Sequence, residues 1–114
     1  MRRDDALLLD ILIAAHKVQT FVGSASSQQF VEDELLQSAV MRQIEVIGEA
    51  ARLVSEQTKD AHPEIPWLAV IGTRNRLIHE YFRIDLTILW DVVINDIPKL
   101  IVAVEPLVPS EDEV

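Results

Sequence analysis

The sequence contains no cysteine, which excludes disulfide bridges, a thiol nucleophile and thiolate metal ligands. No apolar run approaches the about 20 residues that a transmembrane helix needs. Glycine (3) and proline (5) are also few, in a chain that is 49% hydrophobic and 25% charged. This composition is typical of a folded domain rather than a disordered one. At 114 residues we expect one domain, residues 1–108, and an acidic tail at 109–114 that frays.

The first three residues, Met1-Arg2-Arg3, resemble the start of a signal peptide. However, Asp4 and Asp5 interrupt the apolar run that follows, and no small-residue cleavage site comes after it. We therefore expect a soluble cytoplasmic protein without a membrane segment.

Positive charge is scarce, because 10 Lys and Arg face 19 Asp and Glu, a net charge of −9. Such a balance argues against a broad nucleic-acid-binding surface. The exception is the stretch 73–85, which holds Arg74, Arg76, His79, Tyr81 and Arg83. A local cationic spot on an acidic body suits a focused anion site better than a long phosphate track.

Apolar residues recur at helical spacing along most of the chain. The first helix should follow Asp4 and end near Gly23, and a short turn should form around Phe30. Asp33 is placed to cap a second long helix over about 34–58. That helix carries two apolar stripes, which indicates that it packs on two sides. Gly48 in its middle predicts the close approach of another backbone.

Residues 59–66 should form a connection, with Pro66 in the first turn of a helix that runs to Tyr81 or Phe82. Asp85 should cap a last helix from Leu86, and Pro98 should kink or restart it. Together these segments predict an all-α, single-domain bundle of about five helices, one of them short.

If residues 66–82 form one straight helix, an apolar stripe runs along it. Its members are Leu68, Ile71, Asn75, Ile78 and Phe82. Arg74 then lies about 70° to one side of the stripe and His79 about 70° to the other. The two side chains would not share a face, so one chain would not make a complete site. Packing of this helix near a two-fold axis would bring the two residues of both copies to a shared cleft.

An arginine and a histidine in such a cleft would suffice for metal-free transesterification of RNA. The histidine would assist the 2′-hydroxyl in its attack on phosphorus, and the arginine would stabilise the charge on the phosphoryl oxygens. Three neighbours have open roles. Asn75 is expected to be buried and hydrogen-bonded. Arg76 is spaced for an ion pair with Glu80. Glu49 is either a surface carboxylate or a partner that orients the arginine.

The run Arg74-Asn75-x-x-x-His79-x-Tyr81 resembles the Arg-x4-His-x-Tyr signature of HEPN-domain proteins, specifically the HepT-like toxin branch. The resemblance covers nearly the whole chain in the family's order. It includes Ile47-Gly48-Glu49-Ala50, Pro63-Glu64-Ile65-Pro66-Trp67, Ile84-Asp85, Trp90-Asp91 and Asp96-Ile97-Pro98-x-Leu100.

The resemblance implies a helical homodimer that acts as a metal-independent endoribonuclease toxin, without a cofactor. It implies a partner, a minimal nucleotidyltransferase antitoxin, which neutralises the toxin by AMPylation of the tyrosine and can form a larger assembly with it. By matching position, Arg74 and His79 are the catalytic pair, Asn75 a supporting group and Tyr81 the modified residue.

Two other classes of function remain open. The chain could be a non-catalytic subunit that presents Arg74, Arg76 and Arg83 to a nucleotide or substrate of the transferase, which the acidic net charge favours. A metalloenzyme has little support, because His16 and His62 show no ligand spacing with His79.

Overall fold

The computed structural model describes residues 2–79 and 83–109 of the chain, and it is an all-α bundle as predicted. Its long helices are α1 (Arg2–Val22), α3 (Glu34–Leu53) and α5 (Trp67–Leu77), together with a final helical segment. That segment joins α6 (Leu86–Asp91), the π-helix η1 (Val92–Asp96) and α7 (Ile97–Val104). Short elements are α2 (Ser27–Val31), α4 (Glu56–Ala61) and the 3-10 helix η2 (Glu105–Leu107). No helix in the described ranges is long and apolar enough to cross a membrane.

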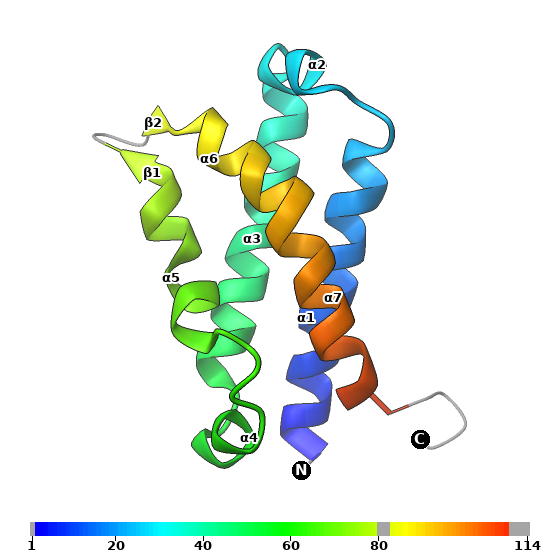
Figure 1. Ribbon diagram of the computed structural model, residues 1–114, viewed down its shortest axis with the longest axis vertical. Helices are drawn as coiled ribbons and strands as arrows, with labels where there is room; N and C mark the ends of the chain where they lie inside the picture. The colour runs from blue at the N-terminus through cyan, green and yellow to red at the C-terminus, as the bar shows by residue number, and fades with distance from the viewer. Residues whose placement is uncertain (1, 80–82, 110–114) are drawn as a thin grey trace.

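The core lies where α1, α3 and the final helical segment meet (Figure 1). The predicted stripe of α1 is buried there, with Ile11, Ala15 and Val18 almost fully covered. Phe30 on α2 closes one end of the core and packs against Trp90, with ring centroids 5.2 Å apart. α1, α3 and the final helical segment form the scaffold, and α5 packs against α3.

Side-chain caps determine where the helices begin. The Asp33 carboxylate accepts a hydrogen bond from Leu36 N at the start of α3, and Asp85 accepts one from Ile88 N at the start of α6. Gly23 ends α1 at φ +54°, a left-handed conformation that favours glycine. All three boundaries confirm the sequence prediction.

The second long helix ends earlier than predicted, at Leu53 rather than near Thr58. Val54 is extended, and Ser55 then caps the new helix α4, so residues 59–61 are helical rather than part of a connection. The buried carboxylate of Asp4 stabilises this break by accepting hydrogen bonds from the backbone N–H and hydroxyl of Ser55 and from the hydroxyl of Thr58. The first helix thus contacts the α3–α4 junction through a polar cluster.

Gly48 confirms the predicted close approach of another backbone. A Cβ atom at this position would lie 3.4 Å from the carbonyl oxygen of Ile71 and 3.7 Å from that of Val70, both on α5. The two helices run in opposite directions, because α3 descends from α2 to α4 while α5 returns toward the hairpin (Figure 1). This contact sets the register between α3 and α5.

The helix that carries Arg74 also ends earlier than predicted, at Leu77 rather than at Tyr81 or Phe82. Two short antiparallel strands follow, β1 (Ile78–His79) and β2 (Arg83–Ile84), with His79 paired to Arg83. Ile78 and Ile84 are β-branched and favour the extended backbone. Asp85 N donates to Leu77 O across 2.8 Å and closes the hairpin at its base. The single straight helix on which the predicted wheel depends is therefore wrong beyond Leu77.

Pro66 and Pro98 lie at or next to the helix positions predicted for them. Pro66 is the N-cap residue of α5, one position before the first turn. Pro98 lies at the start of α7, where the hydrogen-bond pattern changes from π-helical back to α-helical. Ile97 N donates to Val92 O, five residues back, so the helix adjusts its winding next to a residue that has no N–H to donate.

Candidate functional site

Arg74 lies on the last turn of α5 and faces α3. Its Nε atom donates to Oε1 of Glu45 across 3.3 Å, and the two side chains remain 47% and 40% exposed. Among the described residues Glu45 is its polar partner, and the contact uses Nε alone. The two terminal nitrogens of the guanidinium therefore stay available to an anion.

Glu49 is not the partner of Arg74. Its carboxylate binds Arg52 on the same helix, with Nη2 to Oε1 at 2.6 Å and Nε to Oε2 at 3.3 Å. The hydrogen bond and the charge of Arg52 lower the pKa of the Glu49 carboxyl. In the described part of the chain Glu49 is thus an exposed carboxylate paired with Arg52, and no contact of Glu49 with Arg74 supports its alternative role as the residue that orients the arginine.

The predicted apolar stripe of α5 is buried only in part, because Ile71 and Ile78 pack against the core whereas Leu68 and Asn75 do not. Phe82, its last member, lies outside the described residues. Leu68 is 87% exposed, and Asn75, which was expected to be buried, is exposed. The buried positions are Trp67 and Leu77 at the two ends of the helix, and Val70 and Ile71 are partly covered by α3. The reason is that α5 rests on α3 over one short face, so its outer face meets solvent in the single chain.

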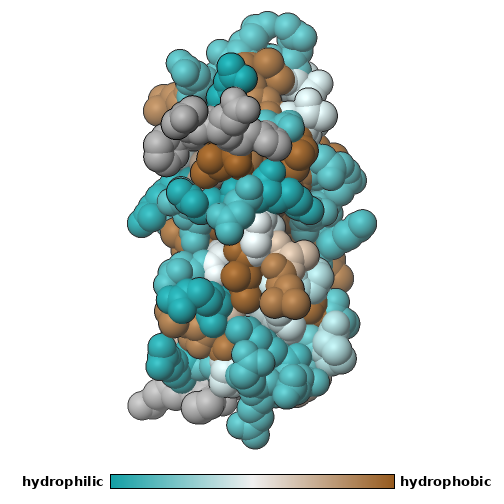
Figure 2. Space-filling model, turned by 90° about the vertical axis from the view of Figure 1, so that its left-hand side faces the viewer, coloured by the Kyte–Doolittle hydropathy of each residue, from teal (hydrophilic) through white to brown (hydrophobic). Residues whose placement is uncertain are grey.

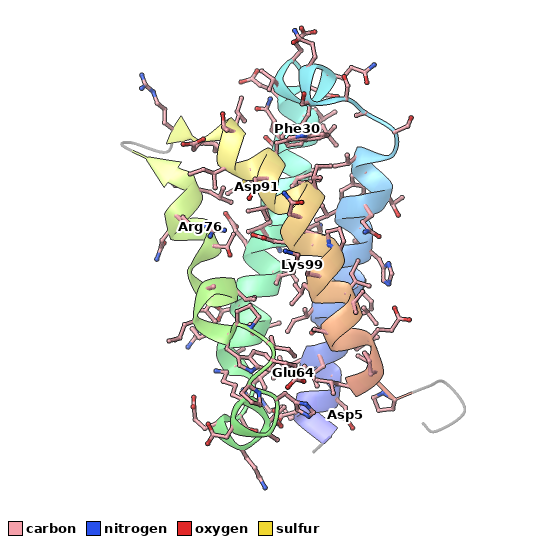
Figure 3. The ribbon with its side chains drawn as sticks, viewed as in Figure 1. Asp5, Phe30, Glu64, Arg76, Asp91 and Lys99 are labelled. Carbon is pink, nitrogen blue, oxygen red and sulfur yellow. The ribbon has the colours of Figure 1, made fainter. Side chains whose placement is uncertain are left out.

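Arg76 points to the other side of α5, toward the last helix (Figure 3). Its Nη2 atom contacts Oδ2 of Asp96 on η1 at 3.4 Å. Glu80, the predicted partner of Arg76, lies outside the described residues. The pair borders a cavity of about 400 Å³ between α5 and α7, with apolar walls that include Ile47 and Leu100. Arg76 is thus separated from Arg74 by the width of the helix.

His79 follows two residues after the end of α5, on β1. Its backbone position is determined at the hairpin base, where Leu77 is fully buried and its carbonyl oxygen accepts from Asp85 N. The His79 side chain and all of Tyr81 lie outside the described part of the structure. A second arginine, Arg83, pairs with His79 in the hairpin register and has an exposed side chain.

The outward face of α5 and its neighbours mixes apolar and charged groups. Figure 2 shows this face, with hydrophobic patches separated by hydrophilic side chains. Leu68 on α5 and Leu35 on α3, 82% exposed, contribute apolar surface on adjacent helices. Across residues 2–79 and 83–109, no three His, Asp or Glu side chains are grouped closely enough to hold a metal ion.

Glu45 is the residue at this site that sequence reasoning missed, although a signal for it exists. Gly48 packs on Ile71, and the two helices are antiparallel. One turn forward along α5 from Ile71 reaches Arg74, and one turn back along α3 from Gly48 reaches Glu45. The pairing follows once the contact partner of Gly48 is known.

Comparisons with known proteins identify the family of the chain. The family described as ribonuclease HepT-like matches residues 11–107. "Putative RNase MJ1380" of Methanocaldococcus jannaschii is 39% identical over 83% of this chain and 87% of its own length. "Probable ribonuclease HepT" of Thermococcus cleftensis is 40% identical over 82% of this chain and 84% of its own length. No solved structure matches the chain significantly. The chain therefore belongs to the HepT-like family of ribonucleases.

Proposed function

We propose that the protein is a metal-independent endoribonuclease toxin in which Arg74 and His79 cleave RNA at a cleft shared by two copies. The observation that supports it most directly is the exposed guanidinium of Arg74, which Glu45 holds through Nε while its terminal nitrogens remain open. The HepT-like family match places this group in a chain of ribonuclease type.

The reaction follows from the chemistry of these two side chains. Neutral His79 accepts the proton of a ribose 2′-hydroxyl as that oxygen forms a bond to the adjacent phosphorus. The phosphorus–O5′ bond breaks, and the departing oxygen takes up a proton, so the products are a 2′,3′-cyclic phosphate and a 5′-hydroxyl. Arg74 donates to the phosphoryl oxygens, whose charge increases in the transition state. The 2′-hydroxyl restricts the reaction to RNA.

The second copy would complete the cleft. Leu68 on α5 and Leu35 on α3 expose apolar side chains, and such surface is commonly covered in oligomers. In the proposed dimer, Arg74 of one copy would lie near the hairpin of the other. Light scattering should give twice the chain mass, and Leu68→Glu should shift the protein toward monomer.

The antitoxin in this proposal is a minimal nucleotidyltransferase that attaches AMP to Tyr81. Tyr81 is two residues from His79 in sequence, so a bulky anionic adduct there would compete with RNA for the arginine. Intact mass should rise in whole AMP units when the two proteins are made together, and the increase should vanish in Tyr81→Phe. Co-expressed protein that has lost its activity but keeps an unchanged mass would contradict this mode of control.

The central experiment is RNA cleavage by the purified protein in the presence of EDTA. We expect 2′,3′-cyclic phosphate ends, and we expect activity to be lost in His79→Ala while His62→Ala, a loop histidine paired with Glu64, retains it. Cleavage that His79→Ala leaves intact would refute the residue assignment. A stable complex with the transferase and no cleavage under any condition would favour the alternative, a non-catalytic partner subunit, which the net charge of −9 also favours.

A further inference from the structure

Glu45 and Gly48 are three positions apart on α3, and Ile71 and Arg74 are three positions apart on α5. At Gly48, α3 packs directly on the backbone of α5, since a Cβ atom added there would lie 3.4 Å from the carbonyl oxygen of Ile71. In antiparallel helices at this separation, Glu45 lies opposite Arg74. The carboxylate is therefore positioned by the backbone packing of two helices, not by a flexible loop.

The Glu45–Arg74 pair is a weak contributor to stability. Both side chains are close to half exposed, and exposed ion pairs contribute about 0 to 1 kcal/mol. Its geometry is nonetheless specific, because the carboxylate holds the internal nitrogen of the guanidinium and leaves the terminal pair unused. A structural bridge would gain most from a bidentate contact through the terminal nitrogens.

Neighbouring carboxylates are differently engaged. Glu49, one turn farther along α3, holds Arg52, and Asp96 on η1 holds Arg76 on the opposite side of α5. Arg52 and Arg76 thus each have their own carboxylate, and Glu45 pairs with Arg74. An arginine with a long flexible stem loses catalytic effect when its fork turns away from the reacting phosphate.

From these contacts we infer that Glu45 is a positioning residue, which fixes the orientation of the Arg74 guanidinium so that its terminal nitrogens face the scissile phosphate. The inference rests on the proposed function of Arg74 as the group that stabilises the phosphoryl oxygens. Glu45 itself need not touch RNA.

The test compares kinetics of three variants on one RNA substrate. Glu45→Ala should lower kcat about tenfold to a hundredfold and leave KM within about twofold, because orientation matters most in the transition state. Glu45→Gln should recover most of the rate, since its amide oxygen can still accept from Nε. Glu49→Ala is the matched control and should retain wild-type kinetics. If Glu45→Ala does not fold, Glu45→Ser replaces it.

Two outcomes would overturn the inference. Kinetics of Glu45→Ala equal to those of Glu49→Ala would show that Arg74 needs no partner. Faster cleavage or tighter RNA binding by Glu45→Ala would show that the carboxylate competes with phosphate for the arginine.

A measurement independent of activity separates this inference from the proposed function. The Nε–H resonance of Arg74, assigned by its loss in Arg74→Lys, should be protected from exchange in wild type and in Glu45→Gln and lose that protection in Glu45→Ala. An inactive wild type with this pattern would refute the ribonuclease proposal and leave the positioning contact standing. Absence of protection in an active wild type would refute the positioning role alone.

Discussion

The two faces of α5 carry arginines that look equivalent in the sequence and differ in the fold. Arg74 and Arg76 are two positions apart, and on an α-helix this separation places them about 200° apart around the axis. Arg74 therefore faces α3 and Arg76 faces η1. One side of the helix meets Glu45, and the other meets Asp96 beside a cavity of about 400 Å³.

The atoms used in the two contacts show what each arginine can do. Glu45 occupies the Nε atom of Arg74 and leaves its terminal nitrogens open to an anion. Asp96 occupies a terminal nitrogen of Arg76, so this side chain links α5 to the last helix across the cavity edge. Among the described residues Arg76 contacts Asp96, which favours a bridging role, and its expected supporting role in catalysis stays a prediction.

Replacing each arginine with alanine should distinguish the two faces of α5 most clearly. Arg74→Ala should lower RNA cleavage at least about a hundredfold, the typical cost of removing one donor that stabilises developing charge. Arg76→Ala should retain activity within about threefold, since its contact is with Asp96. Initial rates of cleavage on one labelled RNA would measure both. Equal losses in the two variants would erase the distinction between the faces.

A larger side chain between α3 and α5 should destabilise the packing on the face of α5 that carries Arg74. Gly48→Leu places a side chain against the carbonyl oxygens of Ile71 and Val70, and overpacking of this kind costs about 1 to 3 kcal/mol. We expect the free energy of unfolding to fall by about 2 kcal/mol in urea titrations. Ser38→Leu, at an exposed position of the same helix, is the control. Unchanged stability in Gly48→Leu would mean that the two backbones do not need this approach.

A substitution that destabilises the fold far from both faces of α5 should not change the activity that depends on Arg74. Asp4 is buried against Ser55 and Thr58, and Asp4→Asn should cost about 2 kcal/mol because an amide cannot accept all three hydrogen bonds. Below its unfolding temperature the variant should cleave RNA at the wild-type rate. Denaturation and kinetics on the same preparation would test both parts, and lost activity in folded protein would contradict the prediction.

The same carboxylate predicts an acid limit to stability. The hydroxyl of Ser55 first, and that of Thr58 second, lower the pKa of Asp4 below its ordinary value of 3.8. The folded state then binds fewer protons than the unfolded chain, so the contribution is complete above this value and is lost as pH falls through the lower folded pKa. The wild-type stability advantage over Asp4→Asn should therefore shrink below about pH 4. An advantage that persists at pH 2 would contradict this cause.

The smallest expected effect concerns the ion pair between Arg76 on α5 and Asp96 on η1. A double-mutant cycle with Arg76→Ala and Asp96→Ala should give a coupling energy of about 0.5 kcal/mol, because both side chains are 49% exposed. The coupling should weaken in high salt. A coupling near zero at low salt would show that the bridge does not hold α5 to η1.

Local patterns were sufficient for much of the fold. Asp33 and Asp85 begin helices because their carboxylates satisfy backbone N–H groups within three residues, a contact that depends on nothing farther away. The helix ends at Leu53 and Leu77 were missed, because hydrogen bonds that define them come from remote residues. Asp4 contacts Ser55 from 51 positions away, and Asp85 reaches back to Leu77 around the hairpin.

The sequence by itself determined the helical class, the position of Arg74, His79 and Tyr81 in one short stretch, and the close approach at Gly48. Only the tertiary structure decided that Glu45, and not Glu49, holds Arg74, and that Arg76 turns to Asp96. The physical reason is that a helix offers several carboxylates at similar spacing. Which of them meets an arginine depends on the register and direction of the neighbouring helix, and those follow from how the two backbones pack.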